Sequence, residues 1–572
     1  MKGTNLHLVA LVACVACAAV VPAAGRGLAP RRSDRRLARS IDAVLSSIYA
    51  PDGPGATAIV VKDGRVVLRK AYGLANVELG VPMRPEMVMA LGSLTKSFTA
   101  AAILKLAEQG RLSLGDPVTR FLPDFPAHGA TITVEHLLTH TSGINVLADM
   151  PDLRAVAAQD GKVTDVIGDW VKDLPPDAAP GERWAYLNWG YSLLGAIVER
   201  ASGLGYAEFL QRAFFDPLEL RHTAYGDRRR LISLRASGYE GLGDGVFNVL
   251  PSRGRIFHPA AAGGLLSNVD DLARWSAALD DGTALGRASV DRMFTPFRLA
   301  DGTSTRYGYG WDLGEYEGHR VQEHAGGTAG FQSFVVRAPD DHVFVAILSN
   351  TQSGDAPLQA TAHRVAAIAM GRPIADPVPR PVPPDALDRM AGVYRGHELG
   401  TFTVSRRGDG LVAQVGGLAE LLLVPVAPST FRSTRVTWTF AFGEGPGGQA
   451  AGVRVTDWKL DDLAVRVVLA PDVAPAFVQL DRADLQACVG EYESLDGVLV
   501  KVGRVDDHLV AQAAAQPPAD LYPASINEFY TRDGGGRFTF VRGSRGVVTL
   551  LLRSTGGGRP VPARRIGSEA CG

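Results

Sequence analysis

The feature that most constrains the fold is a repeat in the last third of this 572-residue chain. Five separate sequence matches keep one offset of 98 positions (490 − 392). They pair Gly392-x-Tyr394 with Gly490-x-Tyr492, Leu411–Gln414 with Leu509–Gln512, Pro425 with Pro523, Phe431 with Phe529, and "FAF" at 440 with "FTF" at 538. Chance would not hold one offset over five matches, so this region is predicted to contain two copies of one module.

Each copy alternates short β-rich runs with Gly-rich turns, which is typical of a small β-barrel. Before them, "PIADPVPRPVPP" (373–384) carries six prolines and predicts a stiff, extended linker. The predicted units are therefore a first domain at 36–372, the linker, and barrels at 385–482 and 483–567. Neither barrel copy clusters reactive side chains, so the chemistry is expected in the first domain.

Residues 1–25 have the pattern of a secretory signal peptide. Lys2 precedes an apolar run from Leu6 to Val21, and Ala23-Ala24-Gly25 supplies small residues for cleavage. The run is shorter than the ~20 residues of a membrane span, and no other segment is long and apolar enough to be one. The pattern predicts a secreted or periplasmic protein, with lipid attachment at Cys14 as the alternative.

Charge and cysteine content narrow the partners. The chain has 59 basic and 60 acidic residues, so nothing in its net charge of −1 favours nucleic acid or an anionic membrane. After signal cleavage, Cys488 and Cys571 remain. In an exported protein they could pair or stay as two unpaired thiols, and the sequence leaves both alternatives open.

The first domain reads as strands at both ends and helices between them. A helix is expected over 36–49, then a hairpin at Asp63-Gly64. After the helical middle, three strands are expected with turns at Gly326-Gly327 and Asp340-Asp341, followed by a helix over roughly 356–370. This order predicts an α/β (α+β) domain in which one antiparallel sheet is flanked by helices and carries an inserted helical lobe.

"ALGSLTKSFTA" (90–100) places Ser93 and Lys96 one helical turn apart, in a helix expected to end near Gly110. A serine hydroxyl is a poor nucleophile unless a base lies beside it, and a lysine at this spacing can reach it. Two other segments strengthen the pattern: Tyr186-x-Asn188 directly before a helix, and His324-Ala325-Gly326 in a strand of the predicted sheet.

With these three motifs in this order, residues ~36 to ~372 resemble the serine β-lactamase and penicillin-binding-protein family. The resemblance is strongest to its class C-like peptidase and esterase branch, peptidase family S12. The competing α/β-hydrolase class needs a Gly-x-Ser-x-Gly elbow, which the sequence lacks.

The resemblance implies a role for each motif residue. Ser93 would form the acyl-enzyme, with Lys96 and Tyr186 transferring protons. Asn188 would orient Lys96 and bind the substrate amide carbonyl, or else cap its helix. The N–H groups of Ser93 and Gly327 would form an oxyanion hole, and Gly326 would let substrate approach the backbone.

The substrate expectation rests on His324 and on the domain layout. Family members usually carry lysine at this place, to hold a substrate carboxylate, and histidine there points to peptidases or esterases. The layout is also similar to D-stereospecific aminopeptidases, which suggests small peptides, amides or esters. The alternatives are a β-lactamase or D-Ala-D-Ala carboxypeptidase, and a non-enzymatic sensor or wall-binding protein.

No cofactor or metal is expected, because no ligand cluster has metal spacing. His140 and Ser142 match a family segment that is structural or borders the site, and His258 is a candidate pocket residue. Contact with the cell wall is an option for the barrels, and the oligomeric state is left open. The loop Gly443–Gly452 is a candidate flap over the site, or else a hairpin far from it.

Overall fold

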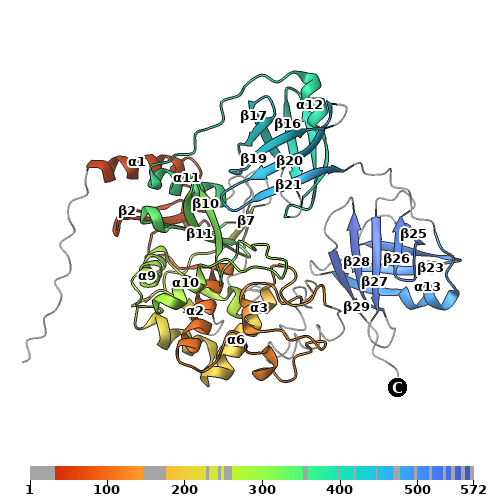
Figure 1. Ribbon diagram of the computed structural model, residues 1–572, viewed down its shortest axis with the longest axis horizontal. Coiled ribbons are helices and arrows are strands. Elements are labelled where there is room, and N and C mark those ends of the chain that lie inside the picture. The colour runs from red at the N-terminus through yellow and green to blue at the C-terminus, as the bar shows by residue number, and fades with distance from the viewer. Residues whose placement is uncertain are drawn as a thin grey trace, which may run out of the picture.

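The structure is a computed structural model (Figure 1). It describes residues 32–145, 176–226, 231–241, 247–249, 260–351, 358–396, 398–415, 420–445, 448–467, 477–494, 499–513, 518–531, 536–542, 548–555 and 561–566. Residues 1–25, which are predicted to be a signal peptide and include Cys14, lie outside these ranges, as do His258 and Cys571. Among the described residues, no helix combines the length and apolar character needed to cross a membrane.

A six-stranded antiparallel sheet organises the first domain. Its strands, in spatial order, are β10 (Asp312–Tyr316), β11 (His319–Thr328), β12 (Phe331–Ala338), β13 (Val343–Ser349), β1 (Ala56–Lys62) and β2 (Arg65–Tyr72). Because β1 pairs with both β2 and β13, the two ends of the domain meet in the middle of the sheet. Asp63 and Gly64 both have positive φ, as a tight hairpin turn requires. The predicted sheet is confirmed.

The two faces of the sheet bury different side chains. Along β1, Ala58 and Val60 pack under α1 (Arg32–Ser46) and α11 (Leu358–Met370), whereas Ile59 faces the helical lobe. This alternation is the period-two pattern of a strand buried on both faces. Figure 1 shows α1 and α11 on one side of the sheet and the lobe on the other.

The lobe carries the central helix and its neighbours. Its helices are α2 (Thr95–Glu108), α3 (Val134–Leu138), α6 (Asn188–Ser202), α7 (Tyr206–Leu210), α8 (Ala260–Gly263), α9 (Val269–Asp280) and α10 (Arg287–Met293). Its short strands are β3 (Leu74–Asn76), β4 (Val81–Pro82), β5 (Met89–Ala90), β6 (Ala224–Tyr225), β7 (Tyr239–Gly241), β8 (Phe247–Val249) and β9 (Leu265–Ser267). The helix α2 is buried on nearly every side, which makes it the hub of the lobe.

Two closed eight-stranded barrels follow, as the repeat predicts. The first contains β14 (Gly392–Arg395), β15 (Thr401–Arg407), β16 (Gly410–Val415), β17 (Leu421–Ala427), β18 (Thr430–Ser433), β19 (Thr439–Glu444), β20 (Ala450–Thr456) and β21 (Asp461–Val467). The second contains β22 (Gly490–Ser494), β23 (Leu499–Val505), β24 (His508–Ala513), β25 (Ala519–Pro523), β26 (Glu528–Thr531), β27 (Gly536–Arg542), β28 (Val548–Thr555) and β29 (Val561–Ile566). The domain limits themselves stay a prediction.

The repeat extends to a helix before each barrel, α12 (Pro384–Met390) and α13 (Arg482–Cys488). The Tyr394 hydroxyl donates to the Met390 carbonyl, and the Tyr492 hydroxyl donates to the Cys488 carbonyl in the same way. Cys488 therefore takes the place of Met390 as a buried core residue, and it forms no disulfide with any residue that the structure describes. Burial raises the pKa of the Cys488 thiol to about 11.

One expectation needs correction. Gly326 and Gly327 do not form a turn: β11 continues through them, and the chain turns at 329–330, where Gly330 has positive φ. Gly326 and Gly327 do not end β11, because the strand is paired with β12 on one side and another backbone approaches it closely on the other, which glycine permits.

For the loop Gly443–Gly452, the structure favours the second alternative, a hairpin far from the site. The described residues of the loop Gly443–Gly452 contact their own barrel, since the Gln449 side chain accepts from Arg466. The opposite end of β20, residues 457–460, reaches the first domain instead. A strand of seven residues separates the two ends by about 20 Å, so they cannot both serve the same cleft.

Candidate active site

Ser93 lies in a 3-10 turn, Gly92–Leu94, that leads directly into α2. Gly92 before it has φ +54, a conformation that suits glycine. The turn enters a helix buried in the lobe, so the side chain one turn on is sealed from water. Lys96 is that side chain, and it is 0% exposed.

The amine of Lys96 has three hydrogen-bond acceptors. Its Nζ lies 3.0 Å from Ser93 Oγ, 2.8 Å from Asn188 Oδ1 and 2.9 Å from the carbonyl oxygen of Ala262. An ammonium has three N–H donors and no acceptor, so this environment satisfies the charged form completely. A buried ammonium without such partners would be strongly unfavourable.

Tyr186 and Asn188 come to the same place from the start of α6. Asn188 is the first residue of the helix, and Lys96 Nζ lies 4.8 Å from the centre of the Tyr186 ring. The Tyr191 ring, one helical turn further along α6, lies 5.6 Å from the same amine. The cation is therefore held between two aromatic rings as well as three oxygen atoms.

His140 accepts hydrogen bonds from the two residues that flank Tyr186 in the chain. Its carbonyl oxygen accepts from the N–H of Ala185 at 2.9 Å, and its Nδ1 accepts from the N–H of Leu187 at 3.1 Å. The imidazole is 2% exposed, and burial, with the charge of Lys96 next, holds its pKa well below the ordinary range. His140 is thus a neutral ring with its proton on Nε2. It contacts the site, which decides between the two roles that the sequence left open for this residue.

The third motif reaches Ser93 through β11. A Cβ on Gly92 would lie only 2.6 Å from the backbone nitrogen of Gly327, so the two backbones are in direct contact. A Cβ on Gly326 would overlap the carbonyl oxygen of Leu91, which already accepts from Ser333 Oγ at 2.7 Å. Glycine is therefore required at both positions, and the N–H groups of Ser93 and Gly327 are brought to one place.

His324 is neutral in this site. Its Nε2 lies 3.1 Å from the Tyr307 hydroxyl, and its Nδ1 lies 2.6 Å from the Ala325 carbonyl oxygen. Burial is the main cause that lowers its pKa to about 4, and the charge of Lys96 adds to it against the opposing carboxylate of Asp312. At neutral pH this position therefore presents no positive charge.

The structure brings all the predicted site residues into one neighbourhood: Ser93, Lys96, Tyr186, Asn188, His324, Gly326 and Gly327. Sequence reasoning missed Tyr307 and the Ala262 carbonyl, which belong to no motif and reach the site only through tertiary packing. Within the described ranges, no group of three or more His, Cys, Asp or Glu side chains is arranged to hold a metal ion.

A serine and a buried lysine on a central helix, set against an antiparallel sheet, define the class of serine hydrolases with the β-lactamase fold. The family model described as Beta-lactamase matches residues 41–370. This chain belongs to that family.

Relatives extend the match. Penicillin-binding protein 4* of Bacillus subtilis is 29% identical over 412 residues, which cover 68% of this chain and 90% of that protein. Protein flp of Staphylococcus aureus is 30% identical over 52% of this chain and 60% of its own length. Among solved structures, the octameric penicillin-binding protein homologue from Pyrococcus abyssi is similar with a TM-score of 0.52 and 27% identity, covering 75% of this chain and 99% of that one.

Proposed function

We propose that this protein is an exported serine hydrolase that forms an acyl-enzyme on Ser93 and acts on small peptides, amides or esters. The single observation that carries the proposal is the buried amine of Lys96, held 3.0 Å from Ser93 Oγ and 2.8 Å from Asn188 Oδ1. A surface serine and lysine one turn apart would have neither the burial nor the third residue. Such an arrangement is what an activated serine nucleophile needs.

Lys96 is assigned as the residue that positions Ser93 rather than as the base. Its three acceptors match the three N–H donors of an ammonium, and an ammonium cannot take a proton. Because Lys96 donates to Ser93 Oγ, the hydroxyl proton of the serine is free to point elsewhere. Tyr186, whose ring centre lies 4.8 Å from the Lys96 amine, is assigned as the general base and acts in that role as its phenolate.

The reaction then proceeds in two steps, acylation and deacylation of Ser93. Ser93 Oγ attacks the substrate carbonyl while Tyr186 takes its proton, and the carbonyl oxygen becomes an oxyanion facing the N–H groups of Ser93 and Gly327. Tyr186 returns the proton to the departing amine or alcohol as the bond to it breaks. Water then attacks the ester in the same way and frees Ser93.

The proposed substrate class follows from His324. With a pKa near 4 it offers no charge to a substrate carboxylate, and the next residue, Ala325, offers only a methyl group. A carboxylate placed there would lose its water without gaining a cation. Neutral amides and esters, including those of D-amino acids, are therefore favoured over β-lactams and D-Ala-D-Ala peptides.

The chemistry is tested by covalent labelling with a fluorophosphonate. Wild-type protein should be labelled once per chain, Ser93→Ala should not be labelled, and the exposed control Ser47→Ala should behave as wild type. Stoichiometric labelling of Ser93→Ala would exclude the assigned nucleophile.

A substrate panel separates the alternatives. It contains D-amino amides, short acyl esters, D-Ala-D-Ala peptides and a cephalosporin. Continuous turnover of the first two is expected. Preferred turnover of the last two would favour the β-lactamase or carboxypeptidase alternative, and one stoichiometric burst without turnover would favour a sensor.

Export is proposed from the pattern of residues 1–25 alone. Amino-terminal sequencing of the protein made from the full gene in a bacterial host should find a chain that begins just after position 25. A chain that retains its first residues in the cytoplasmic fraction would argue against export.

A further inference from the structure

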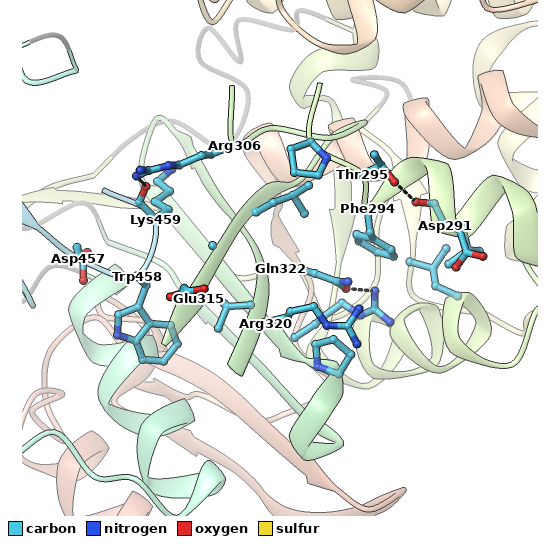
Figure 2. Close-up of a pocket in the computed structure, with 18 of the residues that line it drawn as sticks. Asp291, Phe294, Thr295, Arg306, Glu315, Arg320, Gln322, Asp457, Trp458 and Lys459 are labelled. Atoms are coloured by element: carbon cyan, nitrogen blue, oxygen red, sulfur yellow. Dashed lines mark hydrogen bonds between the residues drawn. The ribbon is translucent and has the colours of Figure 1, made fainter. Parts of the chain in front are cut away.

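The first barrel contacts the catalytic domain at several points, and a central one is the hairpin Asp457–Leu460 between β20 and β21, named here the docking hairpin. The N–H of Glu315 in β10 donates to the carbonyl of Trp458 at 2.8 Å. Gly314 beside it is required, because a Cβ there would overlap the same carbonyl. The docking hairpin therefore lies directly on the edge strand of the catalytic sheet, at the wall of a cavity of about 800 Å³ (Figure 2).

Trp458 anchors this contact. Its ring stacks on His363 with centroids 4.1 Å apart and a 4° tilt, and on Tyr316 at 4.6 Å with an 18° tilt. It is only 4% exposed and belongs to the core between the sheet and α11. An aromatic side chain from the barrel thus completes a core of the catalytic domain.

A buried polar chain continues from this anchor to β11. His363 Nε2 lies 2.7 Å from Glu323 Oε2, and its Nδ1 lies 3.0 Å from Thr437 Oγ1 of the barrel. Thr437 in turn donates to the Asp457 carboxylate at 2.7 Å. Glu323 directly precedes His324 in β11, so the barrel is connected to the residue next to the active-site histidine.

A second connection runs through Lys459. Its Nζ lies 2.8 Å from the carboxylate of Asp312, which pairs in register with Glu323. Its carbonyl oxygen accepts from the guanidinium of Arg306 at 2.5 Å, as Figure 2 shows. The residue after Arg306 is Tyr307, whose hydroxyl contacts His324.

We infer that the docking hairpin, and Lys459 in particular, positions β11 and His324 for the reaction, so that the first barrel is part of the catalytic unit. The inference rests on the proposed function. Pairing of β10 with β11 ends at Glu323, so the segment from His324 to Gly327 is paired on one side by β12 alone. A strand end that contains two glycines is easily displaced. The N–H groups of an oxyanion hole, however, must keep their positions to well within 1 Å to remain effective.

Charge gives Lys459 a second effect on His324. The groups that act on the imidazole are Asp312, which favours its protonated form, and Lys96 and Lys459, which oppose it. His140 is a further titratable neighbour, and the rings of Tyr186 and Tyr307 lie beside it. Removing the charge of Lys459 would leave Lys96 as the one remaining cation that opposes Asp312, so His324 would take up a proton at higher pH.

The test uses full-length protein with Lys459→Met, Lys459→Arg, and Asp312→Asn combined with Lys459→Met. Lys501→Met is the control, since Lys501 forms a 2.9 Å ion pair with Glu491 on the outer surface of the second barrel, away from the docking hairpin. The measurements are kcat and KM for the best ester of the panel, the pH profile of kcat/KM, and the NMR titration of His324, assigned by its loss in His324→Asn.

We expect Lys459→Met to lower kcat about threefold to tenfold with little change in KM, a typical size for residues that act through neighbours. The acid limb of the profile and the His324 titration should move to higher pH. Lys459→Arg should restore both, the double variant should return the titration toward wild type, and Lys501→Met should change neither.

A folded Lys459→Met variant with wild-type kcat and an unmoved His324 titration would overturn the inference. So would equal losses in Lys459→Met and Lys459→Arg, because these would mean that only packing matters. If the wild type turns over no ester, the proposed function fails, and the His324 titration still decides the inference.

Discussion

The imidazole of His140 packs against the phenol ring of Tyr186, with ring centroids 4.3 Å apart and a tilt of 34°. The same histidine takes the backbone N–H groups on both sides of that tyrosine in the chain. His140 itself has φ +59, so a backbone conformation that is unusual for a non-glycine residue is part of this arrangement. The position of Tyr186 is therefore set by a residue 46 positions earlier (186 − 140).

Two substitutions of His140 should distinguish the effect of its hydrogen-bond acceptor from the effect of its ring packing. In His140→Asn the amide oxygen can take the place of Nδ1 and accept from Leu187, whereas His140→Leu leaves that N–H buried without a partner. We expect His140→Leu to lose at least tenfold in kcat and His140→Asn to recover most of it. Steady-state kinetics on folded variants check this. Equal kcat in the two variants would show that the hydrogen bond to Leu187 does not position Tyr186.

Tyr186→Phe should lower kcat by about 10²-fold, the usual scale for a positioned acid or base, with little effect on melting temperature. Tyr191→Phe is the comparison, because the Tyr191 ring is also near Lys96 but its hydroxyl donates to the Leu138 carbonyl. That variant should mainly lose stability. Near-normal kcat in a folded Tyr186→Phe would make Tyr186 a packing residue only.

The contact between Gly92 and Gly327 predicts intolerance of any side chain there. Gly92→Ala places a methyl group 2.6 Å from the Gly327 nitrogen and strains a backbone with φ +54. We expect kcat to fall by about 10²-fold through loss of the oxyanion geometry. Gly53→Ala, where a Cβ meets nothing within 4 Å, is the control. Burst titration should report the active fraction, and wild-type kcat in Gly92→Ala would contradict the assignment.

His324 should make stability depend on pH. Its folded pKa is about 4, below the ordinary value of 6.5, so the unfolded chain binds more protons between these values. Stability must therefore fall as pH drops from about 6.5 to 4, with an upper limit on the order of 3 kcal/mol for this group. Urea unfolding across this range should show a shallower pH slope in His324→Asn than in wild type. An identical slope would mean that His324 titrates normally.

The sequence determined much of the architecture because the signals were local or repeated. The β-branched run in 56–62 followed by Asp63-Gly64 is a local signal that predicts a hairpin. A constant offset of 98 can arise only from a duplicated module, and the two barrels follow from it. The spacing of Ser93 and Lys96 fixed their contact, because both lie on one helical turn.

Only the tertiary structure decided which distant residues complete the site. The carbonyl of Ala262 and the hydroxyl of Tyr307 reach Lys96 and His324 by packing that no local pattern encodes. The protonation of His324 was also beyond the sequence, since it depends on burial and on the charges that surround the imidazole. The sequence also could not tell that Asp457–Leu460, rather than Gly443–Gly452, is the hairpin that meets the first domain. Which end of β20 faces a neighbouring domain is a property of the assembled barrel.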